Sequence, residues 1–99
     1  MIGFYVREPH ATRIINGQKK YEFRDSKSKK LGIPILLLTK KKALGIIQID
    51  RILQIDKEYK FAWRITVIEK FKTPKPYHHP IGAVSWIKEV QFLAKRGHL

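Results

Sequence analysis

The stretch "INGQKKYEFRD", residues 15–25, decides how this chain folds and raises the question of what it does. Its second half alternates with period two, so that Lys20, Glu22 and Arg24 fall on one face of a strand and the aromatic residues on the other. We expect Tyr21 and its face to be core. The charged face is then either the solvated side of the strand or the floor of a site.

The residues before this strand predict a short helix. In "EPHATRIINGQ", residues 8–18, Pro9 suits the first helical position and Gly17 suits the left-handed residue beyond the helix end. Apolar residues recur there at i, i+3 and i+4, a spacing that would dock one face of the helix on the core. These residues are Ala11, Ile14 and Ile15.

The rest of the chain reads as strands joined by polar loops. Apolar, β-prone runs predict strands over residues 1–6, 33–39, 43–56 (one strand or a pair) and 60–72, with Gly45 at a bulge or a close backbone approach. Residues 25–32 and 73–82 read as loops, and a terminal helix is expected from Val84 or Ser85 to Lys95, although its start could equally be a strand. This order predicts one α+β domain over residues 1–99, a small mixed β-barrel of about five or six strands with one or two packed helices.

Composition points to a polyanionic partner. The chain carries 21 Lys and Arg against 8 Asp and Glu, a net charge of +13. Such a field favours nucleic acid first and an anionic membrane second, while the alternative is a lysine-rich composition without such a role. Because basic residues occur along the whole chain, we expect a folded basic surface. Seven lysines are predicted to contribute to it: Lys20, Lys27, Lys29, Lys30, Lys40, Lys41 and Lys42.

Composition also excludes several classes of protein. The absence of cysteine rules out disulfides, thiolate metal sites and a cysteine nucleophile. The first residues reach Arg7 and Glu8 too soon for a signal peptide, and no apolar run approaches the ~18 residues of a membrane span. We therefore expect a soluble, cytoplasmic protein with no membrane partner. The sequence predicts nothing about its oligomeric state.

Few residues offer chemistry. His78 and His79 are adjacent and would point opposite ways on a strand, so neither a metal site nor a cofactor is expected. Neither a Ser-His-acid set nor a phosphate loop is present. What remains is a cluster whose members are Lys19, Glu22 and Arg24, with Trp86 and His10 as neighbours.

That cluster has two interpretations. An exposed Glu22–Arg24 pair on a strand edge would contribute only ~0–1 kcal/mol to stability. In a pocket, by contrast, Arg24 would bind a phosphate or a base edge, and Glu22 would accept from an exocyclic amine. Lys19 would hold an anion or carry a proton. Trp86 is either a platform for a base or a core side chain.

The segment "GQKKYEFR", residues 17–24, resembles the G-x-K-x-x-E-x-R pattern of ASCH domains, a branch of the PUA-like superfamily. Residues 7–24 are similar to the strand-helix-strand entry of that family, residues 43–52 to its central strand with a glycine, and residues 80–86 to its closing segment. The resemblance spans about Ile2 to Trp86. It implies a PUA-like β-barrel, a cleft between barrel and helix that holds the motif residues, and binding of RNA.

The resemblance also implies an enzymatic alternative. One branch of the family hydrolyses the acetyl amide of a modified cytidine. It uses a lysine that matches Lys19 and a threonine nucleophile at the position of Glu22. Glu22 is a poor substitute for the threonine hydroxyl. Another family activity is cleavage of single-stranded RNA through the motif lysine. The leading hypothesis is an RNA- or nucleotide-binding module that uses Lys19, Glu22, Arg24, Trp86 and His10. The alternative is a ribonuclease or nucleoside amidohydrolase with Lys19 and Glu22 catalytic. In a third hypothesis, a basic domain coats RNA without using its pocket.

Overall fold

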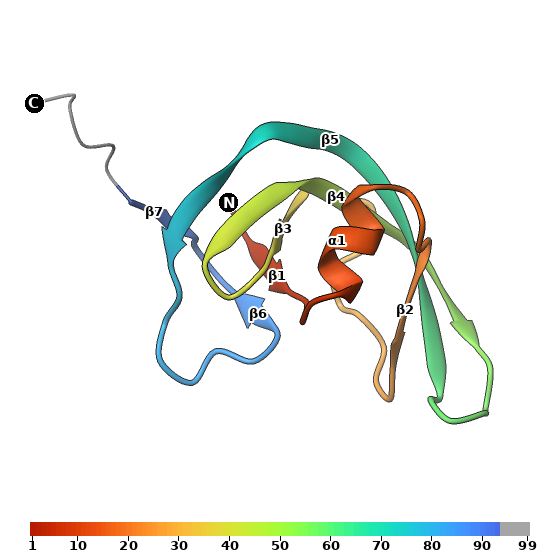
Figure 1. Ribbon diagram of the computed structural model, residues 1–99. Helices are drawn as coiled ribbons and strands as arrows, with labels where there is room; N and C mark the ends of the chain where they lie inside the picture. The colour runs from red at the N-terminus through yellow and green to blue at the C-terminus, as the bar shows by residue number, and fades with distance from the viewer. Residues whose placement is uncertain (94–99) are drawn as a thin grey trace, which may run out of the picture.

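A curled mixed sheet that wraps around one short helix makes up most of the computed structural model, which describes residues 1–93 (Figure 1). In chain order its elements are β1 (Gly3–Tyr5), α1 (His10–Ile15), β2 (Tyr21–Arg24), β3 (Ile35–Leu38), β4 (Lys42–Gln54), β5 (Phe61–His78), β6 (Trp86–Ile87) and β7 (Gln91–Phe92). Six strands follow the order β2-β5-β4-β3-β1-β6, and β7 pairs with β5 beside them. The predicted α+β class is confirmed, and the sheet is a half-barrel.

The β4–β5 hairpin is the backbone of the sheet. β4 is one continuous strand of 13 residues, and β5 is 18 residues long. Both strands arch over the helix in Figure 1. Their pairing shifts register at three places, one of them at Gly45, as the sequence predicted. Bulges of this kind increase local twist, which lets two long strands curl rather than lie flat.

Strand β5 runs through residues that were predicted to be a loop. It continues past Pro74 and Pro76 to His78, so the loop prediction is wrong for residues 73–78. The N–H of Tyr77 donates to the carbonyl of Lys41 at 3.1 Å, so the backbone of Tyr77 faces β4 and that of its neighbour Pro76 faces away. Both prolines therefore lack a donor only on the side away from β4, where proline is tolerated.

Helix α1 docks where the sequence placed it. Ala11, Ile14 and Ile15 are buried, and Gly17 has the left-handed φ of 77° that ends the helix. The helix begins one residue later than predicted, at His10. Its first turn is capped by the carboxylate of Glu8, which accepts from the backbone N–H and the hydroxyl of Thr12 at 2.8 and 2.6 Å.

The core lies on both faces of β3. Ile35 and Leu37 pack with α1, β4 and β5 in one apolar cluster, and Leu36 and Leu38 pack with Phe71 and its neighbours in another. A strand buried on both faces reads as an unbroken apolar run, which explains "ILLL". The first cluster includes Phe4, Trp63 and Ile65 and supports the floor of the site.

Strand β2 is turned over relative to the prediction. Glu22 is only 7% exposed, whereas Phe23 is 41% exposed and Tyr21 is half-buried beside Arg64. The expectation of a core Tyr21 is therefore wrong. β2 ends the strand order, and its inner face looks across the rings of Phe4 and Trp63 into a cleft rather than into closed core.

The predicted terminal helix is wrong within the described residues, and the alternative of a strand at its start is confirmed. Trp86–Ile87 pairs with β1, and Gln91–Phe92 pairs with β5. This segment pairs with the free edge of β1. The N–H of Tyr5 donates to the carbonyl of Ser85 at 2.7 Å, and the N–H of Val90 donates to the carbonyl of Met1 at 3.0 Å. The last two predicted helical residues lie outside the described part of the chain. No helix over residues 1–93 has the length and apolarity that crossing a bilayer requires.

Candidate functional site

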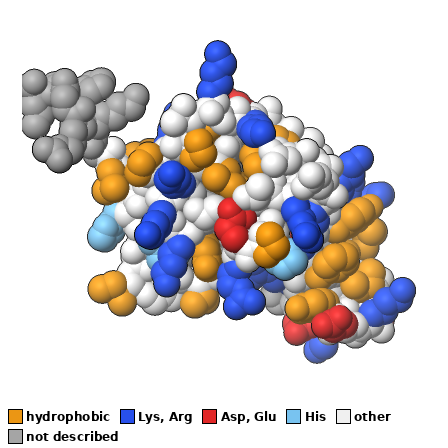
Figure 2. Space-filling model, in the orientation of Figure 1, with side chains coloured by type: hydrophobic (Ala, Val, Ile, Leu, Met, Phe, Trp, Pro, Cys, Tyr) orange, Lys and Arg blue, Asp and Glu red, His pale blue; other side chains and the backbone are white. Residues whose placement is uncertain are grey.

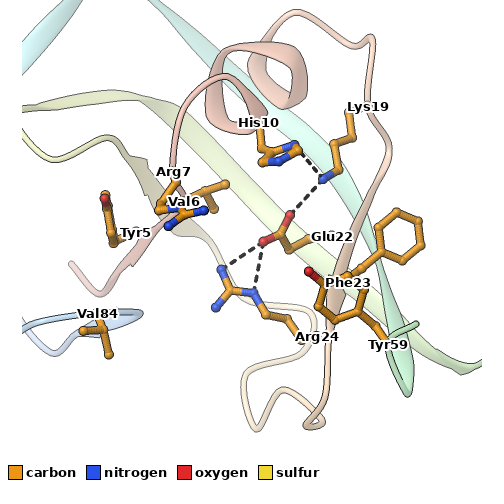
Figure 3. A pocket seen from close by; sticks show the side chains of 10 residues that line it. All are labelled: Tyr5, Val6, Arg7, His10, Lys19, Glu22, Phe23, Arg24, Tyr59 and Val84. Carbon is orange, nitrogen blue, oxygen red and sulfur yellow. Dashed lines mark hydrogen bonds and ion pairs between the residues drawn. The ribbon is translucent and has the colours of Figure 1, made fainter. Parts of the chain in front are cut away.

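Glu22 stands at the centre of the candidate site, between two cations. Its Oε1 lies 3.1 Å from Lys19 Nζ, and its Oε2 lies 3.0 Å from Arg24 Nε and 2.9 Å from Arg24 Nη2 (Figure 3). Two nitrogens of Arg24 thus share one carboxylate oxygen while Lys19 takes the other, and hydrogen bonds between charged groups are stronger than neutral ones. The motif residues are thus brought together in a partly buried triad, not on an exposed strand edge.

Local backbone structure places each member of the triad. Gly17 turns the chain after α1, and the N–H groups of Gln18 and Lys19 both donate to the carbonyl of Arg13, at 2.9 and 3.1 Å. This turn delivers Lys19 to the entrance of β2. Pairing of β2 with β5 sets Glu22 opposite the buried Trp63, so that the carboxylate points into the curl of the sheet.

Arg24 links β2 to the segment that precedes β6. Its Nη1 donates to Ser85 Oγ at 3.0 Å, while its guanidinium carbon lies 4.7 Å from the centre of the Phe4 ring. Cation–π contact with Phe4 and hydrogen bonds to Glu22 and Ser85 fix the plane of the guanidinium. Arg24 is therefore held in place before any ligand arrives.

His10 extends the triad on the helix side. Lys19 Nζ lies 3.2 Å from His10 Nδ1. An ammonium group has only protons to offer, so Nδ1 is the acceptor and the neutral ring carries its proton on Nε2. His10 therefore offers Nε2–H as a donor, and Lys19 keeps one of its three protons for a ligand.

The triad forms the inner wall of a pocket of about 500 Å³ (Figure 3). The pocket is lined by Tyr5, Val6, Arg7, His10, Lys19, Glu22, Phe23, Arg24, Tyr59 and Val84. Three of these residues are cationic and one is anionic. The side chain of Arg7 is exposed and makes no hydrogen bond or ion pair with the described residues. The pocket therefore has a positive excess and an unengaged guanidinium.

Several of the lining residues were not anticipated from the sequence. Arg7 was noted only as a charge, and Phe23 was assigned to the opposite face of its strand. Tyr59 sits in the β4–β5 turn, and no periodic pattern marks such a residue as part of a site. A basic residue directly before the helix was the one available signal, since loops beside a motif often supply its ligands.

Trp86 lies outside the lining of the pocket. Its ring packs 4.7 Å from Phe4 and 6.3 Å from Trp63, centre to centre, and is half-buried against the main core cluster. This is the packing role that the sequence left open. Its stacking on a base stays a prediction.

All seven lysines of the predicted basic surface are exposed. Lysine and arginine side chains spread over the face shown in Figure 2, whereas hydrophobic side chains gather beside the β4–β5 hairpin. The Lys40–Lys42 turn is connected to the pocket by a chain of contacts. Thr39 O accepts from Tyr77 at 2.6 Å, Tyr77 contacts His79, and the His79 ring lies 5.1 Å from that of Tyr5 in the pocket wall.

Tyr77, which lies behind the Tyr5 side of the pocket, has a strongly shifted pKa. Burial, and less strongly the nearby Tyr5, raises the pKa of Tyr77 to about 12. Its hydroxyl lies 2.6 Å from both Thr39 O and His79 Nδ1, and His79 Nε2 donates to Ala83 O at 2.8 Å. No three His, Asp or Glu side chains in residues 1–93 are grouped so as to hold a metal ion.

Comparison of the chain with protein-family models found no match, and comparison with curated proteins found none either. The function must therefore be inferred from the chemistry of the pocket. Donors dominate that chemistry: Arg7, the third proton of Lys19 and His10 Nε2–H can all face a ligand, against the remaining lone pairs of Glu22.

Proposed function

We propose that this protein binds RNA, or a nucleotide, in the cleft between α1 and β2, and that it is an ASCH-type, PUA-like domain of the cytoplasm. One observation carries the proposal: a preorganised, partly buried Lys19–Glu22–Arg24 triad lines an open pocket with an excess of donors. Phosphate and carbonyl oxygens are acceptors that such a pocket would bind, and Arg7 is free to meet a phosphate.

The charge of the whole chain supports the same ligand. With a net charge of +13, the protein attracts polyanions over distances of about a Debye length. Glu22 adds selectivity, because the remaining lone pairs of its carboxylate can only accept and so favour a donor such as an exocyclic amine. A nucleotide offers both groups, a phosphate for the cations and a base edge for Glu22.

A second candidate function is cleavage or other chemistry on RNA. It is favoured by the position of Lys19, whose ammonium contacts both His10 and Glu22 in the wall of the pocket. Lys19 could stabilise a developing negative charge there. His10 is a weaker candidate for the general base, because its Nδ1 lone pair already accepts from Lys19.

Gel analysis of one mixed-sequence, end-labelled single-stranded RNA tests both functions. Native gels measure retention, and denaturing gels measure cleavage. Lys19→Ala removes a pocket cation, and the matched control Lys72→Ala removes an exposed lysine from a separate groove on β5. For a binding module we expect intact, retarded RNA, about tenfold weaker binding by Lys19→Ala and little change for the control.

Three outcomes would decide otherwise. Shortened RNA from the native protein but not from Lys19→Ala would make the second function correct. Equal weakening by both variants would support a basic surface that does not use the pocket. No retention at low salt would contradict RNA binding altogether.

A further inference from the structure

We infer that the aromatic rings of Phe23 and Tyr59 form a platform on which a base of the bound single-stranded RNA stacks, next to the base or phosphate held by the triad. This inference rests on the proposed function and adds a second subsite to it. Both residues line the pocket, at the end opposite Tyr5 and Val84 (Figure 3).

The burial pattern of β2 is the first observation. Phe23 is 41% exposed, while Glu22 beside it is buried. Folding by burial alone would favour the reverse, since an exposed ring forfeits transfer free energy and a buried carboxylate loses hydration. The arrangement keeps a ring available at the mouth of the pocket, where a ligand can cover it.

The pairing of the two rings is the second observation. Tyr59 is also 41% exposed, and its ring is 23° from parallel with that of Phe23, with centres 6.3 Å apart. The turn that carries Tyr59 is held against β2, because Asp25 accepts from the N–H of Lys60 at 3.2 Å and Arg24 pairs with Phe61. Two rings from different elements are thus held in nearly one orientation.

Charge around the rings selects a nucleobase over other apolar ligands. Lys19 Nζ lies 5.5 Å from the centre of the Phe23 ring, so the platform borders directly on a pocket cation. An aliphatic side chain of a protein partner gains nothing from that cation. A base carries its own phosphate within reach of Lys19 or Arg7, and stacking on aromatic rings beside basic residues is the general mode of single-strand binding.

The test compares two fluorescein-labelled eight-nucleotide strands by fluorescence anisotropy: a mixed-sequence RNA and an abasic strand of equal charge. Phe23→Leu and Tyr59→Leu keep an apolar side chain but remove the ring. Phe92→Leu is the matched control, since Phe92 is 47% exposed and lines the separate groove on β5. We expect the first two variants to bind RNA about 5- to 100-fold more weakly and the control to bind within about twofold of native. All four proteins should bind the abasic strand alike.

The outcomes separate this inference from the function on which it rests. RNA retained by the native protein and equally by Phe23→Leu and Tyr59→Leu would overturn the platform and leave RNA binding intact. Equal weakening on the abasic strand would also overturn it, because the rings would then act without a base. Failure of the native protein to bind either strand would overturn both proposals.

If a leucine variant does not fold, photocross-linking of 5-iodouridine RNA to the native protein tests the platform instead. We expect adducts on Phe23 or Tyr59, and adducts only elsewhere would contradict the platform.

Discussion

Glu22 is the buried carboxylate of the described residues, and it organises the site by holding two cations at once. Its burial is tolerated because each oxygen is paired, which offsets the loss of hydration. The triad is thus a structural element as well as the floor of a pocket. A substitution of Glu22 should therefore affect the free energy of unfolding more than it affects ligand binding.

Replacement of Glu22 by glutamine should lower the free energy of unfolding by about 2 kcal/mol, measured by urea denaturation. The amide has nearly the same shape, but it leaves Lys19 and Arg24 without a counter-charge and turns one donor toward another. The control is Glu69→Gln, an exposed carboxylate that makes no hydrogen bond or ion pair with the described residues. A control effect as large as that of Glu22→Gln would contradict a structural role for the triad.

Tyr77 makes stability depend on alkaline pH. Because its pKa is raised to about 12, the folded protein keeps a neutral phenol at a pH where the unfolded chain, with a pKa of about 10, loses its proton. This contribution is present in full below pH 10 and is lost as the pH rises toward 12. Tyr77→Phe should cost about 1 kcal/mol at neutral pH, because its hydrogen bonds are removed, and should unfold with a shallower pH dependence between 10 and 12. Because the lysines titrate in the native protein and in Tyr77→Phe alike, only the difference between their two curves of stability against pH reports on Tyr77. Parallel curves would contradict this assignment.

The helix and the strands differ in how well sequence specifies them. The period of Ala11, Ile14 and Ile15 and the glycine after them were enough to predict α1, because both signals are local. The end of β5 was not predictable from "TPKP", since the prolines are permitted there only because their missing donors face away from β4, which the pairing of distant segments defines. The orientation of β2 likewise depends on whether its inner face meets core or cleft.

The crossing of α1 over β4 depends on Gly45. A Cβ at this position would overlap the carbonyl oxygen of Glu69 and come within 2.6 Å of Ile15 Cδ1. Gly45→Ala should therefore destabilise the protein by about 2–3 kcal/mol in thermal or urea unfolding, because backbone of the neighbouring strand must move.

Gly17→Ala is the matched comparison for that substitution. No atom lies within 4 Å of a Cβ built there, so the only cost is the left-handed φ of 77°, about 1 kcal/mol. If Gly45→Ala were no more destabilising than Gly17→Ala, the close approach of helix and hairpin would not be a constraint on the fold.

At the scale of the molecule, the sequence was sufficient to predict the class of fold and to group the three motif residues in one cluster, but not to predict the shape of the site. The pocket is assembled by β1, α1, β2 and the β4–β5 turn, and Arg7, Phe23 and Tyr59 meet there only after folding. Lys40, Lys41 and Lys42 could not be placed from the sequence either. The Thr39–Tyr77–His79–Tyr5 contacts now connect their turn to the pocket wall.

This connection predicts which part of the basic surface a bound strand follows. A single strand that enters the pocket should continue past Tyr5 toward the Lys40–Lys42 turn. The slope of log affinity against log salt concentration falls by roughly 0.7 for each phosphate that the protein no longer neutralises. Changing these three lysines to glutamine should therefore flatten the slope by about 2, measured by anisotropy with single-stranded RNA between about 50 and 200 mM salt.

Removing three lysines from another part of the surface distinguishes a preferred path for the bound strand from a general electrostatic attraction by the whole protein. Lys70, Lys72 and Lys75 lie on β5, and two of them line the second groove rather than the pocket. Their triple change to glutamine lowers the net charge equally, from +13 to +10, but should flatten the slope by less than about 0.7, because long-range attraction is screened at these salt concentrations. Equal slopes for the two triple variants would mean that the +13 charge acts as a whole and that no face is preferred.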